Sequence, residues 1–288
     1  MNKKIYSFLF ILLLAFCLFF TAANAQKVFF DADNNRLDAS KKLLHLYVLD
    51  LSDADCMLLS YEDENMLIDL GKENQYEQLK TLLDSLNIKD VSVFNTHPHK
   101  DHIGGLVPLA DDYNIKRFYT AFLEDEKGQK NAVKALESQG KQMIRLSMND
   151  ELPFHEDIDI KVLQNKYGGN LNEKSAMLMV HFKNAKLLLT ADIGADSQRY
   201  FIDKLGKDMD ADILKVPHHG KENIKAGFIE SVSPEFCFFT NDAGSTKKAQ
   251  KKLNIYDIPY LFAANGVIHM ATDGETWLVE QLGKTVLE

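Results

Sequence analysis

Hydrophobic and polar positions alternate with several periods along the chain, and each change of period predicts a new element. Short aliphatic and β-branched runs bounded by acidic or Asn/Gly turns are typical of strands, and three such runs follow one another between residues 43 and 69. From Glu73 to Leu86 the leucines recur every three or four positions, which predicts an amphipathic helix. The chain therefore begins β-rich.

The rest of the chain mixes strands and helices. Strands are expected over 91–94, 116–120, 176–182, 185–190, 213–216, 236–240, 260–262, 266–271 and 276–282, with strands and turns over 145–166. Helices are expected from residue 103 onward and near 126–139, 195–205, 223–232 and 246–253. Because much the same order of elements occurs twice, two mixed sheets packed face to face fit better than one doubly wound sheet. We predict an α/β fold, a four-layer αββα sandwich with helices outside each sheet, formed by one domain over residues 43–288.

The N-terminal segment has the pattern of a secretory signal peptide. Lys3 and Lys4 precede an almost unbroken apolar run, and an Ala-x-Ala site ends at Ala25, which predicts cleavage before Gln26. A retained membrane anchor is the alternative, but the run is short for a span and the small residues favour cleavage. We expect an exported protein, periplasmic or extracellular, with residues 26–42 as a loosely held lead-in.

Removal of 25 residues from the 288 leaves 263, and the formal net charge moves from −9 to −11. This acidity argues against broad nonspecific binding to nucleic acid, which needs a basic surface, although metal ions could still hold a phosphodiester locally. No later stretch is long and apolar enough to span a membrane. Cys56 and Cys237 lie in apolar, strand-like runs, so we expect two buried free thiols.

The most informative stretch is a His-x-His-x-Asp-His motif directly after the strand over 91–94. His97, His99, Asp101 and His102 fall within six residues of a strand-to-helix loop, where α/β sheets place their ligands. Neutral imidazoles and a carboxylate suit zinc and related metals. In a tight loop the first two histidines can bind one ion, and the aspartate and third histidine a second. The alternative, a metal-free histidine-rich turn, is disfavoured because a matching half-site follows downstream.

The second half-site comes from two later strands. Asp192 ends one of them, and its two oxygens could bridge two cations; the alternative is a helix N-cap. The pair His218-His219 ends the other strand. One of the pair would complete the second metal and the other would face the reacting group. The residues leave this choice open, and we favour His218 as ligand and His219 as the catalytic histidine.

Four segments together resemble the metallo-β-lactamase superfamily, and within it the hydrolase domain of the ComEC type and its secreted stand-alone relatives. The segments are Met66 to Gly71, Thr96 to Gly105, Leu188 to Asp192 and Ala211 to Gly220. The resemblance implies an αββα sandwich with a hydrolytic centre of one or two ions at the edge between the sheets. Zn²⁺ is the expected cofactor, with Mn²⁺ or Fe as alternatives.

The chain departs from that pattern at several positions. Asn172 occupies the region where many members supply a third histidine, and it could be a weak oxygen ligand, a hydrogen-bond donor or a turn residue. Asp55 alone matches the usual Gly-Gln-Gly-Asp turn, where it would support the loop over 95–105 that carries the His-x-His-x-Asp-His motif, here called the metal loop. Lys221 replaces a serine, and Asn241 lies where DNA-handling relatives often carry a histidine. Asn172, Lys221 and Asn241 are the candidate substrate contacts; Lys100 and Lys221 could bind phosphate, or be ordinary surface lysines.

These features predict an exported metal-dependent phosphodiesterase that uses a metal-activated water. Asp101 or Asp192 would orient the nucleophile, and His219 would donate to the leaving group. The substrate would be nucleic acid or a small phosphodiester such as a phosphocholine ester. Two alternatives remain: a lactam, lactone or thioester hydrolase, and a non-catalytic binding protein on the same scaffold. The sequence makes no prediction of the oligomeric state.

Overall fold

The computed structural model describes residues 26–30, 37, 40–123 and 128–284. The expected signal peptide, residues 1–25, and the beginning of the helix expected near 126–139 lie outside the described residues. Within the described part, no helix has the length and hydrophobicity needed to cross a membrane.

The core of the fold is a pair of mixed sheets. One has nine strands in the order β1-β15-β14-β2-β3-β4-β5-β6-β7, and the other has six in the order β13-β12-β11-β10-β9-β8. The first contains β1 (Val28–Phe30), β2 (Leu44–Val48), β3 (Cys56–Tyr61), β4 (Glu64–Leu70), β5 (Asp90–Asn95), β6 (Asn114–Thr120), β7 (Met143–Arg145), β14 (Ile268–Thr272) and β15 (Trp277–Gln281). The second contains β8 (Ile158–Gln164), β9 (Ala176–Phe182), β10 (Ala185–Leu189), β11 (Ile213–Lys215), β12 (Phe236–Phe239) and β13 (Tyr260–Phe262).

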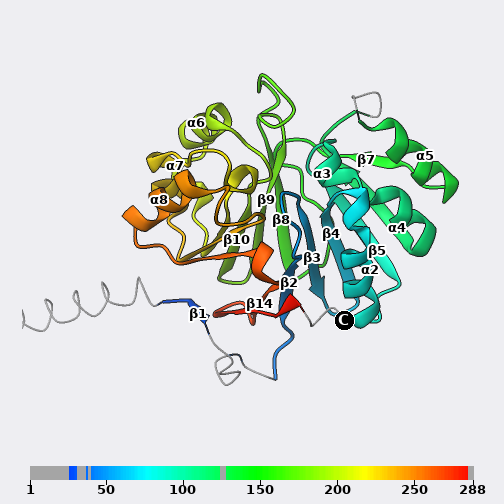
Figure 1. Cartoon of the computed structure of the whole chain (residues 1–288), viewed down its shortest axis with the longest axis horizontal. Helices are drawn as coiled ribbons and strands as arrows, with labels where there is room; N and C mark the ends of the chain where they lie inside the picture. The colour runs from blue at the N-terminus through cyan, green and yellow to red at the C-terminus, as the bar shows by residue number, and fades with distance from the viewer. Residues whose placement is uncertain (1–25, 31–36, 38–39, 124–127, 285–288) are drawn as a thin grey trace, which may run out of the picture.

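Helices cover the outer face of each sheet, which confirms the predicted four-layer αββα sandwich (Figure 1). The nine-stranded sheet carries α2 (Tyr76–Ser85), α4 (Leu106–Asp112) and α5 (Lys130–Ser138), with the short α3 (Lys100–Ile103) at its edge. The six-stranded sheet carries α6 (Ala195–Lys204), α7 (Ala226–Val232) and α8 (Lys247–Ile255). Short 3-10 helices are η3 (Glu73–Gln75), η4 (Gly206–Met209), η5 (Pro217–Gly220) and η6 (Ala263–Asn265).

The hydrophobic pattern explains these layers. In β12, Phe236 and Phe238 pack between the two sheets, whereas Cys237 and Phe239 pack under the helices. A strand buried on both faces reads as a continuous apolar run, which is why this segment shows no alternation. Cys56 and Cys237 are buried and unpaired, as predicted.

Parallel strands bring the candidate site residues to one edge. Strands β4, β5 and β6 are parallel to one another, and so are β10, β11, β12 and β13. The carboxyl ends of such strands lie at one edge, where α/β proteins bind ligands. The metal loop follows β5, and the second half-site follows β10 and β11.

Two local predictions differ from the structure. The helix expected from residue 103 is two helices, α3 and α4, because Gly104 and Gly105 press against the end of β4. A Cβ on Gly105 would lie 2.4 Å from the carbonyl oxygen of Leu70. These glycines therefore seat the metal loop against the sheet. The lead-in over 26–42 also contains β1, which pairs in parallel with β15.

We predict that His45 makes stability fall with decreasing pH. Its Nδ1 lies 3.0 Å from Nε2 of His269, and burial together with that imidazole lowers the pKa of His45 to about 4. An unfolded histidine has a pKa of about 6.5, so between pH ~6.5 and ~4 only the unfolded chain takes up this proton. Stability is therefore lost as the pH falls through that window. In His45→Gln, the loss between pH 7.5 and 5 should shrink by on the order of 1 kcal/mol in urea unfolding.

An unchanged difference between pH 7.5 and pH 5 in His45→Gln would contradict this assignment.

Candidate metal centre

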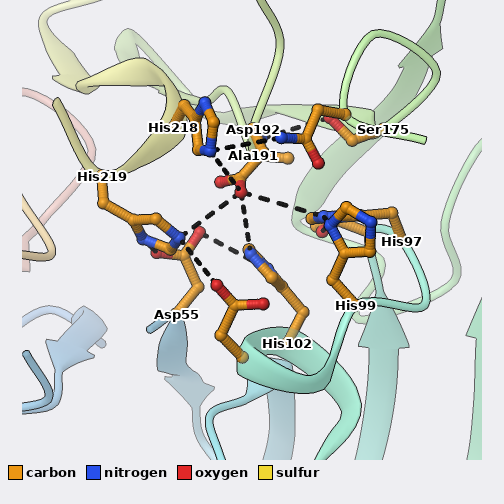
Figure 2. A network of polar contacts seen from close by, with 12 residues as sticks. Asp55, His97, His99, His102, Ser175, Ala191, Asp192, His218 and His219 are labelled. Carbon is orange, nitrogen blue, oxygen red and sulfur yellow. Dashed lines mark hydrogen bonds and ion pairs between the residues drawn. The ribbon is translucent and has the colours of Figure 1, made fainter. Parts of the chain in front are cut away.

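The predicted ligands converge on the carboxylate of Asp192, with imidazoles on several sides of it (Figure 2). From its Oδ2, the nearest Nε2 atoms are 3.2 Å away on His102 and 3.4 Å on His219. Nε2 of His218 lies at 3.7 Å and Nε2 of His97 at 3.8 Å. Two loops that are distant in sequence therefore supply nitrogen donors to one small volume, and a third segment supplies the carboxylate.

His99 and Asp101 complete this group. Nδ1 of His99 lies 3.0 Å from Nε2 of His97, and Oδ2 of Asp101 lies 3.5 Å from Nε2 of His219. All the residues that the sequence singled out as ligands thus lie together. We call them the His/Asp cluster: His97, His99, Asp101, His102, Asp192, His218 and His219.

Asp192 is not the helix cap that the sequence left open. Helix α6 is preceded by Gly194 as its N-cap, and the carboxylate of Asp192 instead faces the imidazoles. Its backbone N–H donates to Oγ of Ser175 at 3.2 Å, which ties the residue to the start of β9. This placement favours the bridging role.

Two further carboxylates fix the orientation of the histidine rings. Oδ2 of Asp69 lies 2.6 Å from Nδ1 of His102, and Oδ1 of Asp55 lies 2.9 Å from Nδ1 of His219. With Nδ1 occupied, each ring presents Nε2 to the centre of the cluster, the arrangement that metal-binding histidines use. A group that could hold a metal also contains Asp55, together with His102, Asp192 and His219. The two carboxylate oxygens of Asp55 contact Nδ1 of His219 and Nζ of Lys215, so we assign Asp55 the role of orienting His219.

Asp69 is a residue that the sequence reasoning missed, since it reads as the end of a strand. Its carboxylate accepts hydrogen bonds from the backbone N–H of Thr96 at 2.8 Å, the Thr96 hydroxyl at 2.7 Å and the Asn95 amide at 2.9 Å. These contacts lock the base of the metal loop onto β4. The available signal was a carboxylate within an otherwise apolar strand, directly before Leu70-Gly71.

Lys215 was missed as well, because it sits inside an apolar strand. Its side chain has no solvent exposure, and Nζ lies 2.7 Å from Oδ2 of Asp55. The same ammonium donates to the carbonyl oxygen of Ala191 at 3.0 Å. Lys215 therefore positions Asp55, which in turn orients His219. It also positions Ala191, which directly precedes Asp192.

Four residues of the site have left-handed backbone conformations. The φ angles are 57° at Asp69, 49° at Ala191, 50° at His218 and 54° at His219. Each such non-glycine residue costs on the order of 1–3 kcal/mol and persists only where the surroundings hold it. At Ala191 the holding contacts are visible, since its carbonyl oxygen accepts from Lys215 and from the backbone N–H of His218.

The electrostatics of the cluster favour a cation. Burial opposes ionisation of Asp192, but the facing imidazoles of His102 and His219 outweigh it and hold its pKa well below the usual range. Conversely, burial opposes protonation of His219, yet Asp192 and Asp55 raise its pKa to about 10. Each group thus stabilises the opposite charge on its neighbours, and the carboxylates of Asp192 and Asp55 favour a positive charge among the imidazoles.

The orphaned donor atoms test whether a metal fits. Asp192 Oδ1, His219 Nε2 and Asn172 Oδ1 are buried and have no hydrogen-bond partner. Unsatisfied buried polar atoms are costly, and imidazole nitrogens with carboxylate oxygens are the donor set that zinc and related ions prefer. The residues present therefore fit one or two bound metal ions.

His218 and His219 differ in a way that bears on their roles. The His219 side chain is fully buried, whereas the His218 side chain is 22% exposed, with Nε2 3.2 Å from the amide nitrogen of Asn172. Only His219 lies near both Asp101 and Asp192. The geometry favours His219 as the ligand and places His218 at the mouth, the reverse of the sequence-based preference.

The three candidate substrate contacts have different environments. Asn172 contacts His218 at the mouth of the cluster. Asn241 is buried, and its side-chain oxygen accepts from the backbone N–H of Asp242 at 2.9 Å. Lys221 forms an ion pair with Asp53, so its ammonium is already partnered. Of the three, Asn172 is best placed to meet a substrate.

Comparison with known proteins places the fold and the motifs in context. The family model of the metallo-β-lactamase superfamily matches residues 49–225. None of the curated proteins compared with the chain matches it. Neither the family model nor the structures below distinguishes the ComEC-type branch, which stays a prediction.

Several solved structures are similar. The metallo-β-lactamase-fold protein YhfI from Bacillus subtilis is 12% identical, with a TM-score of 0.53 over 78% of this chain and 99% of that one. A diphosphatase from the PhnP family is 15% identical, with a TM-score of 0.51 over 80% and 99%. CmlA, a diiron β-hydroxylase from Streptomyces venezuelae, is 10% identical, with a TM-score of 0.50 over 84% and 54%. At these identities the likeness shows the fold alone.

We predict that Lys215→Met lowers the free energy of unfolding by about 3–5 kcal/mol, because it leaves the Asp55 carboxylate buried without its partner charge. Urea unfolding of the metal-free protein measures this loss. Lys134→Met, on the exposed face of α5, is the matched control and should stay within about 0.5 kcal/mol of the wild type.

The double variant Asp55→Asn, Lys215→Met should recover part of the loss, because the two side chains interact directly. Equal effects of the buried and the exposed lysine substitutions would refute the role of the ion pair.

Metal removal should destabilise the protein, because a ligand that binds only the folded state adds about 2.7 kcal/mol at 100 times its Kd. We predict that a chelator lowers the Tm of the wild type. His219→Ala should abolish most of this difference and lose bound metal by elemental analysis, whereas His218→Ala should keep both. A larger metal loss in His218→Ala would restore the sequence-based choice of ligand.

Proposed function

Because the chain belongs to the metallo-β-lactamase superfamily, we propose that it is a metal-dependent hydrolase, and more specifically an exported phosphodiesterase. The observation that carries this is the convergence of five imidazoles and two carboxylates in the His/Asp cluster, with buried donor atoms left unpartnered. Export rests on the signal-peptide pattern of residues 1–25.

The cluster divides into two sets of ligands. Nε2 of His97 and Nδ1 of His99 face each other and would hold one ion. Asp101, His102 and His219 would hold a second, and Asp192 lies between the sets. Bound ions would lower the pKa of a water molecule and polarise the scissile ester. The donor set suits zinc, and the similarity to CmlA, a diiron β-hydroxylase, supports iron as the alternative.

The residues at the mouth would handle the substrate. The Asp101 side chain is partly exposed. Its partial burial opposes ionisation, but the imidazoles of His219 and His102 outweigh this and hold its pKa below the usual range. Asp101 is therefore ionised at neutral pH and can orient the attacking water. Burial lowers the pKa of His218, so this ring is a neutral imidazole whose N–H can donate to a developing oxyanion.

Two observations favour a phosphodiester over the other esters and amides. A diphosphatase is among the structures that share the fold. Lys100, directly after His99, forms no ion pair with a described residue, and it lines the same groove as Asp101. A free ammonium beside the cluster suits an anionic substrate.

We predict that the metal-loaded protein hydrolyses bis-p-nitrophenyl phosphate and that Asp192→Asn lowers kcat/KM by more than about 100-fold, since even residues that only orient metal ligands contribute 10–100-fold. Chromogenic assays against this diester and against nitrocefin measure the preference. Lys134→Met is the control for preparation and folding.

Faster turnover of nitrocefin would move the activity to lactams. A metal-loaded protein that turns over neither compound, nor any lactone or thioester, would favour a binding protein on the same scaffold.

A further inference from the structure

Beside the His/Asp cluster lies a groove of about 1070 Å³, and the proposed chemistry uses only Lys100 and Asp101 of its lining. Helices α3 and α4, η3 and the start of α5 form its walls, and we call it the α3–α4 groove. We propose that it binds the aliphatic chain of an anionic phosphodiester substrate. This inference rests on the proposed function and names the substrate class of the same site.

The floor of the groove is aliphatic. Ile103, Leu106 and Val107 line it, together with Pro98 and Ala132. Val107 leaves 42% of its surface exposed, although Leu106, Leu109 and Ala110 of the same helix are buried. An apolar side chain left at the surface of a concave, apolar lining is typical of a binding groove.

The rim of the groove is basic. Lys72, Lys100 and Lys130 line it, in a chain whose formal net charge is −9. Lys100 and Lys130 form no ion pair with a described residue, whereas Lys72 lies 3.9 Å from Asp53. Two acids line the groove with these three lysines, the exposed Glu73 and the partly exposed Asp101. The excess of ammonium groups above an aliphatic floor complements a molecule with an apolar chain and a negative head.

The groove is continuous with the His/Asp cluster through Asp101. This residue lines the groove, and its carboxylate faces His219 in the cluster. A phosphodiester bound at the cluster would therefore direct one of its two ester substituents along α3 and α4. The groove would hold that substituent while the other one leaves.

The lining also argues against a nucleic acid as the occupant. Proteins that bind single-stranded nucleic acid stack the bases on aromatic side chains. No aromatic side chain is among the described residues that line the α3–α4 groove. An aliphatic chain needs no such platform and gains from each methylene that it buries.

A homologous series of 4-nitrophenyl alkyl phosphates tests the inference, with methyl, butyl and octyl as the retained group. Water adds to phosphorus, the bond to 4-nitrophenolate breaks, and the alkyl phosphate and a proton are released. Since a buried methylene can raise affinity by up to about fourfold, we expect kcat/KM to rise at least tenfold from methyl to octyl.

Val107→Asn should remove most of this gain and leave the methyl ester within about twofold of the wild type, because Val107 lies outside the His/Asp cluster. Ile144→Asn is the matched control, since Ile144 is 41% exposed on β7 and does not line the groove. It should keep the full gain. A kcat/KM that is independent of chain length, or an equal gain in Val107→Asn, would overturn the inference.

The same design separates the two proposals. If no ester is hydrolysed by the metal-loaded protein, the phosphodiesterase proposal fails. Calorimetry then tests the groove by itself: octyl phosphate should bind at least tenfold more tightly than methyl phosphate, and Val107→Asn should lose this difference. Equal affinities would refute the groove, and so would binding of an oligothymidylate but not of octyl phosphate.

Discussion

The structure of the site depends on one buried ion pair, between Lys215 and Asp55. Lys215 belongs to the six-stranded sheet, whereas Asp55 directly precedes β3 of the nine-stranded sheet. The pair therefore joins the two halves of the sandwich at the edge where the His/Asp cluster lies. Asp55 then orients His219, and Lys215 holds the carbonyl group of Ala191. Buried charges are expensive unless they are paired, so this arrangement tolerates little displacement of either sheet.

A consequence is that the residues that form the site also lower the stability of this edge of the fold. The site gathers unpartnered donor atoms and left-handed residues, both of which oppose folding. A cation bound to the folded state would offset these terms through the coupling of binding to folding. The hydrogen bonds of Asp69 and the close packing of the two glycines hold the metal loop on β4 against these terms.

Next to this polar edge, the α3–α4 groove has the opposite character. Aliphatic residues of α3 and α4 line it together with three lysines, in a chain that is acidic as a whole. In the proposed reaction, the polar centre would select the reacting group, and the groove would select the chain attached to it. Such a division lets a widespread hydrolytic scaffold act on a particular class of molecule without any change in its ligands.

The sequence by itself determined the layers and the ligand types. Period-2 and period-3.6 patterns are local, so the strands, the helices and the αββα order could be predicted from them. The clustered histidines predicted a metal site. Three features could not be predicted, because they depend on partners far along the chain: the roles of His218 and His219, the orienting carboxylate of Asp69 and the burial of Lys215. Asp55 and His219 are 164 positions apart, and no local pattern records that they meet. Only the packing of the two sheets decided which polar residues share one buried volume.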